Sequence, residues 1–292
     1  MTPNNKYENI KKLAKNELDN LEKYMVQIIN TREPLNSHII NFLTAPSKRV
    51  RPLLSVLFYK SMYKDINNEQ LKALCAVELI HSASLIHDDI IDKSDTRRGL
   101  KTLAYEFGNK LGVISGDYLL SLAMQIITEL GSIQLLQNFS NTLNKMCIGE
   151  INQNFDKFKI GTIETYIEKS KNKTAYLFET ALVTPFYTGL NKNIENASIF
   201  GLNVGIAFQI RDDLMNLIKE NESKPTQNDI SDGIYNAPVI YAGSAQNFTN
   251  GIEKTKDLLN NYINKAYSGI KDLPDNEYKI GLEQFLEFLK FD

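Results

Sequence analysis

The chain has 292 residues, of which 42% are hydrophobic and 23% are charged, as in ordinary globular proteins. Its formal net charge of −2 argues against nucleic acid as a partner, because nucleic-acid-binding surfaces are strongly basic. Cys75 and Cys147 lie far apart without metal-site spacing, which predicts a reducing, cytoplasmic setting and no disulfide framework. We expect neither a signal peptide nor a membrane span, since no stretch approaches about 20 uninterrupted apolar residues.

Hydrophobic residues recur with a helical period along the whole chain, and alternating strand-like runs are nearly absent. No internal repeat or long linker divides the chain, so residues 1–292 are predicted to form a single all-α domain. Pro185 is expected to kink or end its helix, and Gly201 and Gly205 to permit close packing. The predicted helices cover residues 4–30, 37–43, 53–63, 69–87, 111–130, 132–158, 163–187, 193–219, 237–243, 250–268 and 277–291.

A cluster of carboxylates, Asp88, Asp89 and Asp92, ends the helix predicted at 69–87, and Arg97 and Arg98 follow it. Asp88 and Asp92 are four residues apart, so on a helix they point the same way. Like charges near a helix C-terminus cost stability, and a bound cation would offset that cost. Oxygen ligands favour Mg²⁺, which often shares its coordination shell with phosphates, and arginines bind phosphate in a bidentate manner. A solvated acidic surface is the alternative, but such a surface seldom follows a segment patterned for burial.

A second acidic pair, Asp212 and Asp213, ends another apolar helix. Two such helices can face each other across a bundle, with metal ions between them holding one diphosphate. The position four residues after Asp212 is Asn216, which offers a neutral oxygen and no charge.

A basic turn, SKRVRP at residues 47–52, precedes the helix predicted at 53–63. Basic side chains at a helix N-terminus oppose the helix dipole, so an anionic ligand there would relieve the conflict. A solvated basic turn is the alternative.

Together these motifs resemble the trans-type (head-to-tail) polyprenyl diphosphate synthases, over roughly residues 48–238. SKRVRP is similar to the family's G-K-x-x-R-P, with Ser47 in place of Gly, and ELIHSASLIHDDIIDKSDTRRG resembles its first aspartate-rich region. KTA at residues 173–175 and the Phe-Gln before the second acidic pair also match. The resemblance implies an isoprenoid-synthase-like helical bundle around a large central cavity. It also implies a Mg²⁺-dependent prenyltransferase that condenses isopentenyl diphosphate with an allylic diphosphate.

The resemblance assigns substrate and metal residues, which fall into three sets. Isopentenyl diphosphate is held by Lys48, Arg51, His81 and Arg98. The allylic diphosphate is held by Arg97, Lys173, Thr174, Gln209 and Lys224. Mg²⁺ is bound by Asp88, Asp92 and Asp212, with Asp89 and Asp213 in support, and these five aspartates are the implied catalytic residues. The remaining histidines, His38 and His87, are expected to be structural.

Besides Ser47, three positions in the second half depart from the family pattern: Asn216 stands for Asp, Ile234 for a phosphate-binding Lys, and Asn236 for Thr. These departures leave open a non-catalytic or partner-dependent subunit of a heteromeric synthase, although the first cluster is intact. A terpene cyclase is less favoured, because it has no second substrate for the set of Lys48, Arg51 and His81 to hold. We expect a cytoplasmic homodimer, with a heterodimer as the alternative, that contacts the membrane peripherally for product release.

Two small residues, Ala83 and Ser84, lie five and four residues before Asp88. The resemblance implies that large aromatic residues at these positions would close the tunnel and stop chain growth. Small residues here predict a deeper tunnel and a product of about thirty to forty carbons, because apolar burial favours filling the tunnel. Tight packing against another helix is the alternative reading of both residues. The candidates for a lower floor are Leu119, Leu122, Met124, Ile126 and Ile127.

Overall fold

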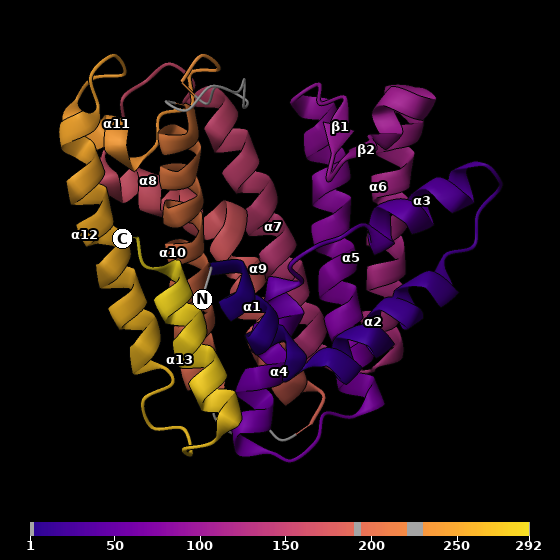
Figure 1. The fold of residues 1–292 in the computed structure, drawn as a ribbon. Helices are drawn as coiled ribbons and strands as arrows, with labels where there is room; N and C mark the ends of the chain where they lie inside the picture. Colours follow the sequence, from indigo (N-terminus) through magenta and orange to yellow (C-terminus); the bar gives the residue numbers. More distant parts are fainter. Residues whose placement is uncertain (1–2, 190–193, 221–229, 292) are drawn as a thin grey trace.

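The computed structural model describes residues 3–189, 194–220 and 230–291, which are almost entirely helical (Figure 1). The helices of the first half are α1 (Pro3–Lys12), α2 (Lys15–Ile28), α3 (Leu35–Thr44), α4 (Val50–Met62), α5 (Asn68–Ile91), α6 (Leu103–Glu129) and α7 (Ile133–Phe155). Those of the second half are α8 (Ile163–Ser170), the π-helix η1 (Lys171–Ala175), α9 (Tyr176–Tyr187), α10 (Ile194–Glu220), α11 (Ala237–Ala242), α12 (Thr249–Ser268) and α13 (Glu277–Leu289). Two-residue strands, β1 (Thr96–Arg97) and β2 (Leu100–Lys101), are the sole sheet in these ranges. The predicted all-α class is confirmed.

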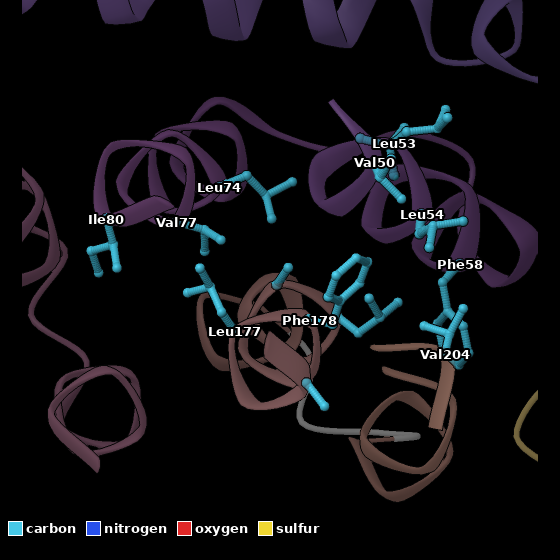
Figure 2. Close-up of a cluster of buried hydrophobic side chains, with 14 of the residues drawn as sticks. Val50, Leu53, Leu54, Phe58, Leu74, Val77, Ile80, Leu177, Phe178 and Val204 are labelled. Carbon is cyan, nitrogen blue, oxygen red and sulfur yellow. The ribbon is translucent and has the colours of Figure 1, made fainter. Parts of the chain in front are cut away.

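Helix α9 lies in the interior, where its apolar sequence packs against α4, α5 and α10. Figure 2 shows Leu177 and Phe178 of α9 beneath α4 and α5, with Val204 of α10 beside them. Gly201 and Gly205 of α10 face α9 and the end of η1 so closely that an added Cβ would lie 2.8 Å and 2.6 Å from the Cα atoms of Glu179 and Ala175. The predicted close packing at both glycines is therefore confirmed.

The N-terminal helix predicted over residues 4–30 is wrong as a single element, because the chain breaks between α1 and α2. The break lets α1 pack on α13 while α2 packs on α5. Neither Gly nor Pro marks it, so the hydrophobic pattern alone runs on across the break.

The helix predicted over residues 163–187 is also interrupted, but not where Pro185 was expected to act. The regular helix gives way to a π-helical turn over η1, and Pro185 lies inside α9, two residues before its end. The carbonyl of Pro185 accepts a hydrogen bond of 2.9 Å from Gln70 Nε2 on α5. Single π-turns within helices often occur at functional sites, and this one carries the predicted Lys173 and Thr174.

The short hairpin after α5 was not predicted. Its two-residue turn, Arg98–Gly99, has positive φ at both positions, 53° and 79°, as a tight hairpin turn requires. Helix α6 then begins at Leu103, eight residues earlier than expected, with Thr102 accepting a hydrogen bond from the Tyr105 amide as its N-cap. Gly108 interrupts the first turns of α6 with φ 80° and ψ 159°.

Among the described helices, α6 is long and apolar enough to cross a membrane by length and composition, although it contains no uninterrupted run of about 20 apolar residues. Of the 18-residue window that meets this test, 39% is buried in the protein. Buried core helices of other proteins pass the same test, so this property alone is weak evidence for membrane insertion.

Candidate active site

A cavity of about 910 Å³ lies between α5, α6, α7, η1 and α10, and the basic turn before α4 closes one side of it. The C-terminal end of α5 and the hairpin lie at the same end of the bundle as α8 and α11 (Figure 1). Most of the predicted site residues, whether for substrate, metal or chain length, line this one cavity: Lys48, Arg51, His81, Ala83, Ser84, Asp88, Arg97, Arg98, Lys173, Thr174, Gln209 and Asp212. Lys224 lies outside the described residues.

A second, smaller cavity of about 180 Å³ shares Lys173, Gln209 and Asp212 with the first, so the two adjoin. Its walls hold two further acidic candidates, Asp92 and Asp213, and the three second-half positions that depart from the family pattern, while Asp89 lines neither cavity. The further lining residues are Asp92, Gln153, Lys169, Ser170, Asp213, Asn216, Asp232, Ile234 and Asn236. The carboxylates of α5 and α10 therefore border one continuous polar region, as the two acidic motifs predicted.

The basic turn is fixed by its middle residue, Arg49, to which the sequence assigned no role. Arg49 adopts a left-handed conformation, with φ 49° and ψ 41°, at the N-cap of α4. Its guanidinium lies 3.2 Å from the carboxylates of Glu78 and Glu22 and also donates to the carbonyl of Leu43. This buried anchor ties the turn to α2, α3 and α5, and so places Lys48 and Arg51 at the cavity.

Arg51 is prepared for an anion. Its guanidinium lies 4.5 Å from the centroid of the Phe178 ring, and its buried Nε has no hydrogen-bond partner among the described residues. Burial lowers the pKa of Arg51 to about 10, so the side chain remains charged. The hydroxyl of Ser47, in the same turn, is also buried without a described partner. Two orphaned donors beside a cavity indicate a missing acceptor, and a phosphate supplies several.

His81 lies in the same wall. Burial, followed by the charges of Arg51 and Arg98, lowers the pKa of His81 well below its usual value. The imidazole is therefore neutral and retains one N–H donor, which adds a contact for an anion without adding another cation to the cluster.

The three aspartates of the first acidic cluster have different surroundings. Burial raises the pKa of Asp88 to about 6, against the opposing effect of Lys173. Asp92 caps the end of α5 through its backbone amide, which donates to Asp88 O at 2.8 Å. Asp89 is buried and accepts a hydrogen bond of 2.5 Å from Arg97 Nε, so it holds that arginine at the rim of the cavity.

The second acidic cluster is organised by a chain of hydrogen bonds. Thr174 Oγ1 donates to Gln209 Oε1 at 2.5 Å, and Gln209 Nε2 donates to Asp213 Oδ1 at 2.9 Å. The hydroxyl of Tyr166 donates to the other oxygen, Asp213 Oδ2, at 2.6 Å. Asp213 is buried, whereas Asp212 is exposed and lines both cavities. Burial, reinforced by Asp213, raises the pKa of Tyr166, so this donor stays protonated.

The π-turn positions Lys173 between the two acidic clusters. Its Nζ lies 2.9 Å from Glu150 Oε2 on α7, a residue that the sequence reasoning did not select. Burial opposes the charged form, but Asp88 and Glu150 together raise the pKa of Lys173, so the lysine is a cation. Gly149 allows the approach, since an added Cβ there would lie 2.9 Å from Asn172 Cβ.

The carboxylates suit an ion that completes its shell with ligand oxygens. Within the described ranges, no three His, Cys, Asp or Glu side chains converge closely enough to hold an ion by themselves. The raised pKa of Asp88 shows a carboxylate that the protein alone stabilises poorly, and a nearby cation would correct this. Mg²⁺ usually binds one or two carboxylates and substrate phosphates, so the donor set of Asp88, Asp92 and Asp212 fits it.

The apolar lining of the cavity includes the two small residues of α5. Ala83 and Ser84 line the cavity, together with Leu120 of α6 and Leu143 and Met146 of α7. The five residues named as candidates for a lower floor do not line it. Met124 and Ile127 nevertheless share the helix face of Leu120, because they follow it by four and seven residues.

Both histidines that were expected to be structural contact neighbouring elements, and His87 also lines the large cavity. His38 Nδ1 lies 3.0 Å from Pro34 O, and its ring packs edge-on against Phe107. His87 Nε2 lies 3.3 Å from Val113 O and packs against Gly116, where an added Cβ would lie 2.2 Å from it.

Comparison with known proteins shows which family this chain belongs to. The sequence profile described as Polyprenyl synthetase matches residues 32–274. A prenyl transferase of Cyanidium caldarium is 31% identical, with 92% of this chain and 93% of that protein covered. Heptaprenyl diphosphate synthase component 2 of Geobacillus stearothermophilus is 31% identical, with 84% and 85% covered.

Among solved structures, a polyprenyl synthase from Caulobacter crescentus CB15, complexed with calcium and isoprenyl diphosphate, superposes with a TM-score of 0.87. It is 24% identical, and 97% of each chain is covered. This likeness establishes the isoprenoid synthase fold. The profile and the relatives extend over nearly the whole chain, and the chain therefore belongs to the polyprenyl synthetase family of prenyltransferases.

Proposed function

We propose that the protein condenses isopentenyl diphosphate with an allylic diphosphate in a Mg²⁺-dependent reaction, giving an all-trans polyprenyl diphosphate of about thirty to forty carbons. One observation carries this proposal: a single cavity is lined by the cationic side chains of the basic turn and the hairpin and by one carboxylate from each acidic motif, Asp88 and Asp212. The cationic side chains suit a diphosphate without metal ions, and the carboxylates suit a diphosphate that carries its metal ions. We propose that residues 1–292 act as one catalytic domain.

The charged groups have separate roles in this reaction. Lys48, Arg51, His81 and Arg98 hold the diphosphate of isopentenyl diphosphate, while Arg97, Lys173 and Gln209 face the allylic substrate. Bound Mg²⁺ supplies electrophilic stabilisation of the charge that develops on the leaving diphosphate. Lys173 is charged and already placed, so it contributes to the same stabilisation without reorganising.

Fixing two substrates in one cavity replaces an encounter in solution. Correct orientation of this kind lowers a barrier by about 7–11 kcal/mol. The double bond of isopentenyl diphosphate attacks the allylic carbon, the C–O bond to diphosphate breaks, and the departing diphosphate accepts the proton that is then lost. This scheme requires no protein nucleophile.

Two similarities support the choice of metal and product. The Caulobacter structure contains calcium, which is a hard, oxygen-binding cation like Mg²⁺. The Geobacillus relative is named for a heptaprenyl product, whose thirty-five carbons lie within the proposed range. Its description as component 2 keeps a partner-dependent subunit as the second candidate, together with Asn216 and Ile234 in the smaller cavity.

Release of inorganic diphosphate from farnesyl diphosphate tests the proposal. A synthase releases it only when isopentenyl diphosphate and Mg²⁺ are both present. Release without isopentenyl diphosphate would identify a terpene cyclase. Tight substrate binding without release would identify a subunit that depends on a partner.

We also propose a cytoplasmic homodimer that contacts membranes peripherally when it releases product. Light scattering after size-exclusion chromatography tests the oligomeric state. Co-sedimentation with phospholipid vesicles, before and after turnover, tests the membrane contact.

A further inference from the structure

The smaller cavity is lined by a lysine, Lys169, to which neither the sequence motifs nor the proposed reaction assigns a role. Asp92, Asp212, Asp213 and Asp232 line this cavity, and Lys169 and Lys173 are the lysines among its lining residues. Lys173 also borders the large cavity, whereas Lys169 borders only the small one. The side of the small cavity away from the large one therefore has Lys169 as its positive group, while Ile234 on the same lining offers none.

Lys169 is held in place rather than left in solvent. Its Nζ lies 3.3 Å from Asn236 Oδ1 and 5.5 Å from the centroid of the Tyr166 ring. Both partners are themselves fixed, since Tyr166 donates to Asp213 and Asn236 is only 4% exposed. A half-buried lysine with an ordered ammonium group loses less conformational entropy when it binds an anion.

The position of Asn236 strengthens this reading. Asn236 is the N-cap residue of α11, where an asparagine side chain commonly accepts a hydrogen bond from the first turn. Here the side chain makes no capping hydrogen bond and instead accepts from Lys169. A side chain that could stabilise its own helix is thus used to orient a lysine at the cavity.

Lys169 and Lys173 are four residues apart across the start of the π-turn, and both border the small cavity. Two like charges so placed repel each other unless an anion lies near both. The aspartates nearby need cations of their own, so a metal–diphosphate complex satisfies both sets of charges.

We propose that Lys169 binds the diphosphate of the allylic substrate in the small cavity and supplies the positive charge that Ile234 lacks on the same lining. This inference rests on the proposed function, because it assigns a further binding residue to that substrate.

The direct test is calorimetric titration with farnesyl thiolodiphosphate and Mg²⁺, a probe whose C–S bond resists cleavage. Lys169→Met should weaken binding about tenfold to a hundredfold, the range expected for one charge-assisted hydrogen bond. Lys169→Arg, which keeps the charge, should stay within about threefold of the wild type. The double variant Lys169→Met with Ile234→Lys should recover most of the lost affinity, because it returns a cation to the same lining.

Lys171→Met is the matched control. Lys171 lies two residues away, 3.6 Å from the exposed Glu168, and borders neither cavity, so its loss should leave probe affinity unchanged. Unchanged affinity in Lys169→Met would overturn the inference. An equal loss of affinity for isopentenyl diphosphate, or no recovery with Ile234→Lys, would also overturn it, by showing structural damage instead of a lost charge. Because the probe does not react, a wild type that binds it but makes no product would contradict the proposed function and leave the role of Lys169 standing.

Discussion

The guanidinium of Arg49 and the carboxylate of Glu78 form an ion pair of 3.2 Å in which the two side chains are only 6% and 3% exposed. The pair joins the turn before α4 to the middle of α5, so it sets the position of Lys48 and Arg51, which line the cavity. Its partners lie far apart in sequence, and the left-handed backbone of Arg49 persists because Glu22 and Leu43 hold the same guanidinium.

We predict that Glu78→Gln destabilises the protein by about 3 kcal/mol, because it leaves a buried guanidinium without a neutralising partner on that side. Urea denaturation measures the change. Asp19→Asn is the control, since it breaks an exposed ion pair with Lys15 and should cost less than about 1 kcal/mol. A Glu78→Gln variant as stable as Asp19→Asn would show that the buried pair is not the anchor of the turn.

Arg51→Met should raise the KM for isopentenyl diphosphate about tenfold or more and leave the KM for the allylic substrate unchanged. The reason is that its buried Nε awaits an acceptor in the cavity. Arg97→Met, on the rim beside Asp89, should have the opposite selectivity. Steady-state kinetics with each substrate varied in turn decides this, and reversed selectivities would mean that the two sites are exchanged.

Asp88→Asn should abolish turnover yet stabilise the metal-free protein at neutral pH. Burial raises the pKa of Asp88 from 3.8 to about 6, so the folded state binds more protons than the unfolded state between these values. The stability contributed by the protonated carboxyl is therefore present below pH 3.8 and is lost as the pH rises through about 6. Above that, the charged carboxylate costs about 3 kcal/mol, a cost that the amide does not have.

Unfolding free energies measured in EDTA test this sign. Asp88→Asn should exceed the wild type at about pH 7.5 and match it near pH 4. Asp212→Ala is the companion for activity, since the exposed Asp212 should lose turnover without the same gain in stability. Greater stability of the wild type at pH 7.5 would contradict the account of Asp88.

The contrast between Asp88 and Arg49 shows what the sequence could predict. Asp88, Asp89 and Asp92 form a local pattern at the end of an apolar helix, so their chemistry and common position were accessible from spacing alone. Arg49 was visible as a basic residue, but its partners Glu22 and Glu78 become neighbours only through the packing of α2 and α5 on the turn.

The same limit applies to Tyr166 and Lys169. Both lie on α8 in a segment that reads as an ordinary amphipathic helix, and their partners Asp213 and Asn236 follow much later in the chain. The break between α1 and α2 and the π-turn also arise from tertiary packing, with no Gly or Pro to mark them. Local periodicity predicted the helices, and long-range contacts decide where they bend.

Ser84→Phe should shorten the product to about fifteen or twenty carbons, because a phenyl ring there fills the cavity that the growing chain enters. Ala83→Phe should act similarly with a loss of stability, since Ala83 is only 3% exposed. Ser121→Phe, on the exposed side of α6, is the control and should leave the product unchanged. Chromatography of dephosphorylated products reads out the length. An unchanged product in both variants would mean that the chain grows along another path.

The central claim is that this chain alone elongates an allylic diphosphate in its cavity, and mass spectrometry of the reaction products tests it most directly. Purified protein is incubated with farnesyl diphosphate, excess isopentenyl diphosphate and Mg²⁺. The lipid products are then extracted and their molecular masses are measured. The account predicts all-trans products of about thirty to forty carbons, and none when Mg²⁺ is chelated. Recovery of only the fifteen-carbon primer under the complete conditions would contradict it.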